Sequence, residues 1–159
     1  EVDLYYVVGN HERISANKNE SLDKENFGYF ILEMIKYRCS TLKGLTIHSN
    51  KFDDEIITFD IFDKKIVATH GNNFGRVNTY VNKLTSMIGY IPDYVCVGHL
   101  HQSTEITHNN TELIINGSFS GTDSYAKNYG LIGKPSQKLM IFSEEYGREC
   151  TYNIELGVD

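Results

Sequence analysis

Three short motifs, each directly after a stretch typical of a β-strand, constrain this chain more than any other feature. They are Gly9-Asn10-His11-Glu12, Thr69-His70-Gly71 and Gly98-His99-Leu100-His101. Neutral imidazole nitrogens and amide oxygens are borderline donors that suit Mn, Fe, Zn or Ni, whereas Mg and Ca prefer shells made of oxygen. Because such donors follow strands from distant parts of the chain, the motifs predict a folded domain with a transition-metal site.

The third motif leaves two geometries open. On a continuing strand, His99 and His101 would point to the same face of a sheet, since side chains alternate with a period of two. In a turn, the two imidazoles would diverge toward two neighbouring ions. Gly98 before them gives the backbone room to bend.

The order of the motifs resembles the second half of the calcineurin-like metallophosphoesterase signature. That signature runs Asp-x-His, Gly-Asp, Gly-Asn-His-(Asp/Glu), a lone His beside Gly, and Gly-His-x-His, and this chain carries the last three. The resemblance implies four metal ligands, with Asn10, His70 and His99 on one ion and His101 on the other. It therefore implies two divalent transition-metal ions (Mn, Fe, Zn or Ni) in the intact protein.

The resemblance also implies a role for two residues that do not bind metal. It leaves the imidazole of His11 facing the substrate, where a group that titrates near neutral pH can donate a proton to a leaving alkoxide. The carboxylate of Glu12 would orient that ring and raise its basicity. The implied activity is hydrolysis of a phosphoester, as a phosphatase or phosphodiesterase, by two ions about 3.5 to 4 Å apart.

The first two motifs of the signature do not occur before Gly9, because only eight residues lie there. The chain begins at Glu1 and enters at once the apolar run Leu4–Val8, which is typical of an internal strand. We therefore expect residues 1–159 to form a single metallophosphoesterase-like domain that lacks its N-terminal part. Most ligands of one ion and the bridging Asp would then lie outside it, so the fragment alone is expected to hold at most one nearly complete site.

Composition limits the partners. The net charge of −6 and the pI near 5.5 argue against a general electrostatic grip on nucleic acid. Bound divalent ions would nevertheless reverse the potential inside a cleft. We therefore expect a phosphoester substrate, with two alternatives open: a DNA or RNA nuclease of the same family, and a catalytically inactive binding or scaffold module. Uncovered sheet edges would favour a homo-oligomer.

The expected compartment is the cytoplasm. The apolar runs are far shorter than the roughly 18 residues of a membrane span, so no membrane association is expected. The three cysteines are odd in number and share no metal-binding spacing, which favours reduced thiols over a disulfide framework. They are Cys39, Cys96 and Cys150.

Apolar periodicity supplies the scaffold. It predicts helices at Phe27–Cys39, with apolar residues including Phe27, Phe30, Ile31 and Met34, and at Phe74–Ile88. It predicts strands at Leu4–Val8, Ile56–Phe62, Lys65–Thr69, Tyr94–Val97, Thr104–Thr107, Glu112–Ile115, Lys138–Phe142 and Glu149–Glu155. The polar stretch Ser15–Glu25 predicts a loop or short helix, and His48 and His108 lie in polar contexts without a role. The fold class is α/β, a mixed β-sheet sandwich flanked by helices, as in calcineurin-like phosphoesterases, of which we expect only the second half.

Overall fold

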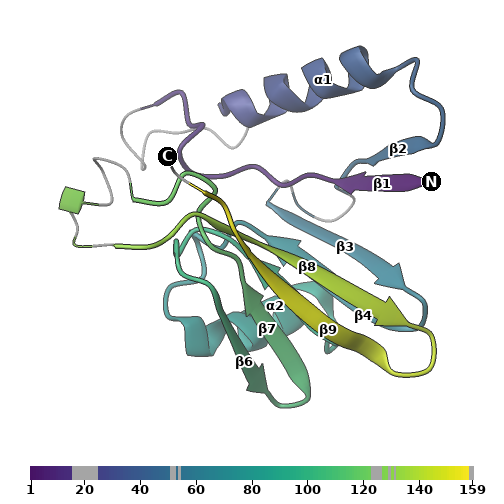
Figure 1. The fold of residues 1–159 in the computed structure, drawn as a ribbon, viewed down its shortest axis with the longest axis vertical. Helices are drawn as coiled ribbons and strands as arrows, with labels where there is room; N and C mark the ends of the chain where they lie inside the picture. Colours follow the sequence, from purple (N-terminus) through teal and green to yellow (C-terminus); the bar gives the residue numbers. More distant parts are fainter. Residues whose placement is uncertain are drawn as a thin grey trace. The chain divides into compact units, whose positions relative to one another are not determined.

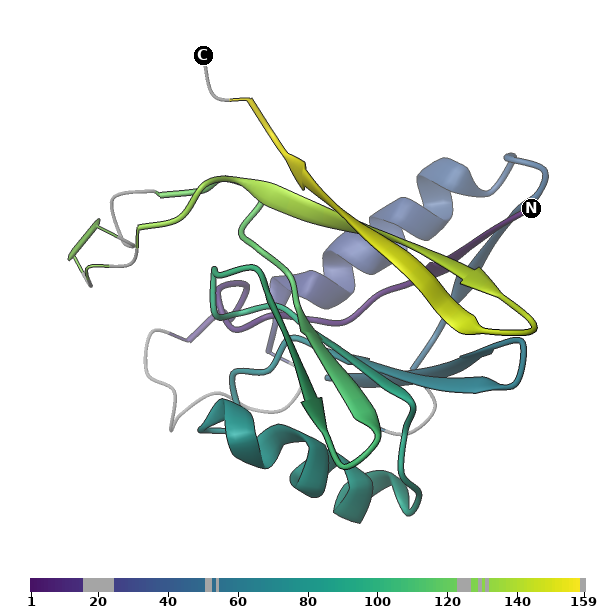
Figure 2. The same cartoon turned by 60° about the horizontal axis from the view of Figure 1, so that its bottom comes forward.

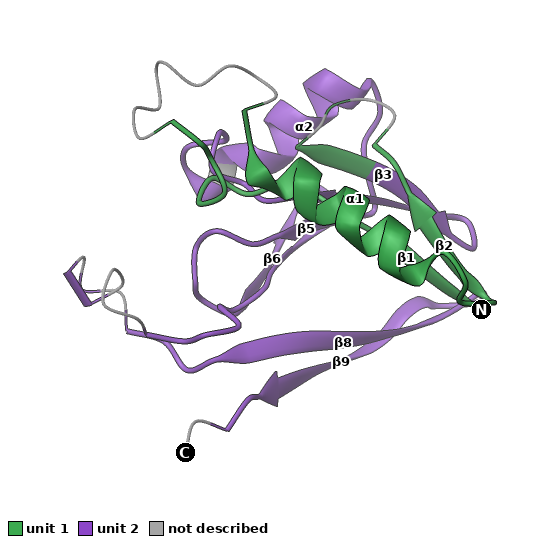
Figure 3. Cartoon of the chain, turned by 90° about the horizontal axis from the view of Figure 1, so that it is seen from above, with its two compact units in different colours: residues 1–57 green, residues 58–159 purple. Residues whose placement is uncertain are grey.

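The computed structural model describes residues 1–15, 25–50, 53, 55–122, 127–128, 130 and 132–157. The chain forms two compact units, residues 1–57 and residues 58–159, coloured separately in Figure 3. The expectation of a single domain over 1–159 stays a prediction. Most of the loop predicted at Ser15–Glu25 lies outside the described residues.

The first unit contains a small parallel sheet and one long helix (Figure 1). Strand β1 (Val2–Tyr5) pairs with β2 (Leu45–His48), so that Val2 lies opposite Leu45 and Tyr5 opposite His48. The ring of His48 stacks on that of Tyr5, with 4.3 Å between the centroids, and its Nε2 lies 2.6 Å from Asp3 Oδ1. The His48 side chain thus ties the ends of the two strands together.

Helix α1 (Phe27–Cys39) has the bounds that the sequence predicts. It begins after Asn26, whose side-chain oxygen accepts a hydrogen bond from the Gly28 N–H at 2.7 Å and so satisfies one free donor of the first turn. A Cβ atom on Gly28 would come within 2.8 Å of Val8 Cγ1. A glycine is therefore needed where the helix approaches the segment after β1.

The predicted apolar residues of α1 lie on its exposed side. Phe30 is 63% exposed, and Phe27 and Met34 are also about half exposed (56% and 49%). The residue of α1 that is fully buried is Gly28. The glycine of α1 approaches its unit closely, whereas these large apolar side chains remain exposed.

The second unit is built on a mixed five-stranded sheet with the order β3-β4-β5-β7-β6. Its strands are β3 (Ile56–Ile61), β4 (Lys64–Thr69), β5 (Tyr94–Val97), β6 (Thr104–His108) and β7 (Thr111–Ile115). Strands β4, β5 and β7 run parallel, and β6 pairs with β7 in the antiparallel sense. The central strands carry the core residues Val67, Val95 and Leu113, each at most 2% exposed.

Two elements cover the faces of this sheet (Figure 2). Helix α2 (Tyr80–Ile88) lies on one face, after the short 3₁₀ turn η1 (Val77–Thr79). The hairpin of β8 (Ser136–Ser143) and β9 (Gly147–Glu155) lies on the other. Beneath the hairpin, Met140 and Phe142 pack against a buried cluster of Ile66, Tyr94 and Ile114.

Helix α2 is shorter than the predicted Phe74–Ile88. The carbonyl of Phe74 accepts hydrogen bonds from the side chains of Thr79 (3.2 Å) and Lys83 (2.8 Å). Side chains thus satisfy a group that a longer helix would have satisfied with a backbone N–H, and the α-helix begins only at Tyr80.

No helix within the described part of the chain is long and apolar enough to cross a membrane. All three cysteines are free thiols. Burial raises the pKa of Cys96 to about 11, so this thiol on β5 stays protonated at neutral pH.

Two positions on α2 provide a matched test of the core. Leu84 is completely buried, whereas Met87, one turn away, is 44% exposed. We expect Leu84→Ala to lower the free energy of unfolding by about 2–5 kcal/mol, because it leaves a cavity, and Met87→Ala to lower it by less than about 1 kcal/mol. Urea denaturation followed by circular dichroism measures both. Equal losses would contradict this packing of α2.

Candidate metal centre

Two of the predicted ligands come together at the carboxyl ends of β4 and β5. These strands are parallel neighbours in which Thr69 lies opposite Val97, so the residues that follow them emerge side by side. The imidazole rings of His70 and His99 have centroids 5.1 Å apart and planes at 67°. In open α/β sheets this edge is where ligands commonly bind.

Gly71 explains why His70 is followed by glycine. Its φ of +100° lies in a region that side chains rarely adopt, and a Cβ atom there would come within 2.5 Å of Val97 Cγ1. The buried hydroxyl of Tyr80 donates to the Gly71 carbonyl at 3.0 Å. The chain is thus held in a tight bend directly after His70.

The Gly98-His99-Leu100-His101 segment forms a turn and not a continuing strand. The Leu100 N–H donates to the Gly98 carbonyl at 2.6 Å. His99 and His101 both have left-handed backbones, with φ of +58° and +56°. Such conformations are costly for residues other than glycine and are often found at functional sites. Of the two geometries that the sequence left open, the turn is confirmed.

Buried polar atoms without partners occur at the ends of the parallel strands and in the segments that follow them, Asn72 Oδ1 among them. Thr69 Oγ1, His101 Nδ1 and Asn116 Oδ1 are buried and have no hydrogen-bond partner. Buried polar atoms are nearly always satisfied, so such atoms indicate a missing water, ion or ligand. The donor chemistry of the imidazoles fits a transition-metal ion.

The convergence of donors is nevertheless incomplete. In the described ranges, no group of three or more His, Cys, Asp or Glu side chains lies close enough together to hold a metal ion. The structure therefore brings together His70 and His99, and the assignment of His101 as a ligand stays a prediction.

The motif Gly9-Asn10-His11-Glu12 lies in the first unit, after β1. Asn26, which caps α1, also donates through Nδ2 to the Gly9 carbonyl at 2.9 Å, and the Phe27 N–H donates to the Glu12 carbonyl at 2.8 Å. The start of α1 therefore fixes the backbone of the motif.

The side chains of this motif differ in burial. His11 is exposed, whereas Glu12 Oε2 is buried without a hydrogen-bond partner. Burial, together with the nearby charge of Glu12, raises the pKa of Tyr6. The roles of Asn10, His11 and Glu12 stay predictions.

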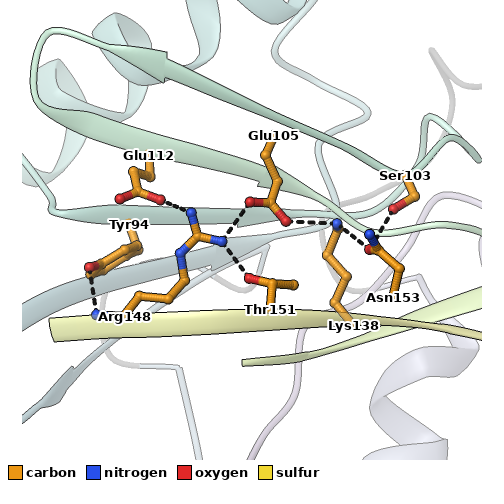
Figure 4. Close-up of polar contacts among 8 residues, drawn as sticks. All are labelled: Tyr94, Ser103, Glu105, Glu112, Lys138, Arg148, Thr151 and Asn153. Carbon is orange, nitrogen blue, oxygen red and sulfur yellow. Dashed lines mark hydrogen bonds and ion pairs between the residues drawn. The ribbon is translucent and has the colours of Figure 1, made fainter. Parts of the chain in front are cut away.

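A polar cluster that the sequence analysis missed lies between the hairpin and the five-stranded sheet (Figure 4). Its members are Tyr94, Ser103, Glu105, Glu112, Lys138, Arg148, Thr151 and Asn153. The guanidinium of Arg148 contacts Glu105 at 2.5 Å and also Glu112, while Lys138 Nζ donates to Glu105 at 2.9 Å. Only 5% of the Lys138 side chain is exposed. The two cations of β8 and β9 thereby clamp the hairpin to β6 and β7.

The charges of this clamp depend on one another. Burial acts to raise the pKa of Glu105, but the hydrogen bonds and charges of Arg148 and Lys138 outweigh it, so this pKa lies below its ordinary value of 4.5. Burial acts to lower the pKa of Arg148, but the hydrogen bonds and charges of Glu105 and Glu112 raise it. A polar cavity of about 500 Å³ borders the clamp. The two cations of the clamp, Arg148 and Lys138, already have carboxylate partners.

Comparison with known proteins identifies the fold. No protein-family model matches the chain. One curated relative, the SPbeta prophage-derived uncharacterized protein YonJ of Bacillus subtilis, is 24% identical over an alignment of 111 residues, and the match covers 67% of this chain. The match spans only 27% of the length of that relative.

Two solved structures share the architecture at low sequence identity. Protein TM1076 of Thermotoga maritima has a TM-score of 0.55 and 11% identity, with 97% of this chain and 98% of that chain covered. A novel archaeal phosphodiesterase has a TM-score of 0.52 and 18% identity, with 85% and 66% covered. The α/β fold class predicted from the sequence is confirmed, and the chain shares its architecture with the archaeal phosphodiesterase. The expectation that the chain is only the second half of the calcineurin-like phosphoesterase fold stays a prediction.

The clamp predicts a pH dependence of stability. Because the pKa of Glu105 is lowered on folding, this residue stabilises the fold at pH values above 4.5, and the contribution disappears as the pH falls through the lowered pKa. We expect Glu105→Gln to be less stable than wild type at pH 7 and the difference to shrink below pH 4.5. Urea midpoints measured from pH 7 to 3 test this, with Glu144→Gln, in the exposed β8–β9 turn, as control. A difference that does not change with pH would contradict the assignment.

Proposed function

We propose that the protein is a metal-dependent phosphoester hydrolase, a phosphatase or phosphodiesterase. The observation that carries the proposal is the pair of adjacent imidazoles, His70 and His99, at the carboxyl edge of parallel strands. Gly71 and Tyr80 hold the bend that directly follows His70, and two imidazoles so close together have the chemistry of metal ligands. The likeness of the fold to that of an archaeal phosphodiesterase supports the reaction class.

In the proposed mechanism each residue has a separate task. His70 and His99, together with His101 and Asn10, would bind divalent ions through neutral imidazole nitrogens and an amide oxygen. When bound, such ions supply an activated water and stabilise the charge on the phosphoryl oxygens. The exposed His11 would donate a proton to the leaving oxygen, and the buried carboxylate of Glu12 would orient it.

A second candidate is a binding or scaffold module without catalytic activity. The observation that favours it is the absence, in the ranges that the structure describes, of three converging metal-binding side chains. Such a module would retain the fold and lack turnover. The two candidates differ in whether the protein binds metal tightly and hydrolyses a phosphoester.

The test combines metal binding with turnover. With Mn²⁺ added to the intact protein, we expect hydrolysis of bis(p-nitrophenyl) phosphate or p-nitrophenyl phosphate, and the ratio of the two rates distinguishes a diesterase from a monoesterase. Hydrolysis of single-stranded DNA but of neither small ester would indicate a nuclease. Metal binding without any turnover would favour the binding module, and neither binding nor turnover would refute the proposal.

We expect His99→Ala to lower both bound Mn²⁺ and turnover at least 10-fold, because it removes one of the two adjacent imidazoles. Metal analysis after gel filtration and the colorimetric assay measure the two effects. The control is His108→Ala, because the imidazole of His108 lies at the end of β6, near Asn82. Unchanged metal content in His99→Ala would exclude the ligand role.

His11 has a different expected signature. Because it would act on the leaving group and not on the metal, His11→Ala should slow turnover at least 10-fold with little change in bound Mn²⁺. The same two assays apply. Parallel loss of metal and activity would contradict the role of His11 as a proton donor.

A further inference from the structure

Asn116, to which the sequence analysis gave no role, directly follows β7. Its N–H donates to the carbonyl of Val97 at 2.8 Å, which continues the parallel pairing of β5 with β7 by one residue. Asn116 therefore lies beside Gly98, the first residue of the turn that carries His99. Three neighbouring parallel strands thus deliver His70, the His99 turn and Asn116 to one edge of the sheet.

The orientation of the Asn116 amide is fixed by a neighbour on the hairpin. Gln137 Nε2 donates to two carbonyl oxygens, those of Ser136 (2.6 Å) and Gly117 (3.3 Å). Because carbonyl oxygens only accept, the amide nitrogen of Gln137 must point to them and its oxygen must point away. That oxygen accepts a hydrogen bond from Asn116 Nδ2 at 2.9 Å. The amide nitrogen of Asn116 thus already has a hydrogen-bond partner, and its amide oxygen lies on the opposite side of the amide group.

The oxygen that remains has no protein partner. Asn116 Oδ1 is buried and makes no hydrogen bond, like three other atoms that end or follow these strands, Thr69 Oγ1, Asn72 Oδ1 and His101 Nδ1. The amide of Asn116 is held in place, and its nitrogen has a hydrogen-bond partner whereas its oxygen has none. The oxygen is therefore placed to interact with a group outside the chain. An amide oxygen is also a ligand that divalent cations take in proteins.

We propose that Asn116 Oδ1 is an oxygen ligand for the divalent cation held by His70 and His99, and that Gln137 is the positioning residue that presents it. The inference rests on the proposed metal-dependent function. It adds a ligand from a third strand, one that no motif in the sequence marks. Because the hairpin is clamped to the sheet by Arg148 and Lys138, the position of Gln137, and with it that of the amide, is set by the fold.

The test is titration of the purified protein with Mn²⁺ by isothermal calorimetry. Asn116→Leu removes the oxygen at similar volume and is expected to raise the Kd at least 10-fold. Gln137→Met, which frees the amide, should raise it by a smaller factor. Asn82→Leu makes the same chemical change on the exposed side of α2 and should leave the Kd within twofold of wild type.

Asn116→Asp separates a ligand from a merely structural residue. It keeps an oxygen at the same place but, like Asn116→Leu, cannot donate to Gln137. A ligand role predicts a Kd at or below that of wild type, whereas a structural role predicts the same loss as in Asn116→Leu. If Asn116→Leu fails to fold, the Kd of Asn116→Asp alone decides, and a value at least 10-fold above wild type overturns the inference.

The outcomes also separate this inference from the function on which it rests. If wild type binds no Mn²⁺, the proposed metal-dependent function fails and the inference fails with it. If wild type binds Mn²⁺ and Asn116→Leu binds it equally well, Asn116 is not a ligand, and the proposed function stands.

Discussion

The parallel pairing of β4, β5 and β7 is the constraint on which the rest of the second unit depends. Its register sets Thr69 opposite Val97 and Val97 opposite Ile115, so the residues that follow the three strands emerge together. A slip of one residue would turn every side chain of a strand to the other face of the sheet, and would replace Val67 and Val95 in the core with neighbours of a different size, Ile66 or Ala68 and Tyr94 or Cys96. The core and the candidate metal centre are therefore fixed by the same hydrogen bonds.

The hairpin adds a directional restraint to this arrangement. Apolar contacts beneath it, such as Tyr94 against Phe142, favour burial but specify position weakly. The contacts of Arg148 and Lys138 with Glu105 and Glu112 are directional, and removal of one partner would weaken the charge pairing in a partly buried cluster. The same strand that carries Lys138 carries Gln137, so the clamp and the orientation of Asn116 are linked through β8.

The sequence predicts much of this fold because its apolar pattern and turn residues are clear. Helix α1 and strand β5 have the bounds that the pattern predicts. Strand β2 (Leu45–His48) was missed because it alternates apolar and polar residues over only four positions, whereas the four residues of β5 form a continuous run without a charged or amide side chain. The exposure of the apolar residues of α1 was not predicted, because periodicity identifies the apolar face of a helix but does not show which element packs against that face.

The candidate site was predicted in part for a similar reason. Motifs locate His70 and His99, because these lie at the ends of recognisable strands. They do not reveal Asn116, whose orientation depends on Gln137, or the clamp, whose Glu105 and Arg148 lie 43 positions apart in the sequence.

Whether the imidazoles at the carboxyl edge of the sheet bind a divalent ion can be tested by histidine side-chain NMR during addition of Mn²⁺. We expect selective broadening of the His70, His99 and His101 resonances at low Mn²⁺, with those of His48 and His108 unchanged. Equal broadening of all five, or broadening of none, would contradict this expectation.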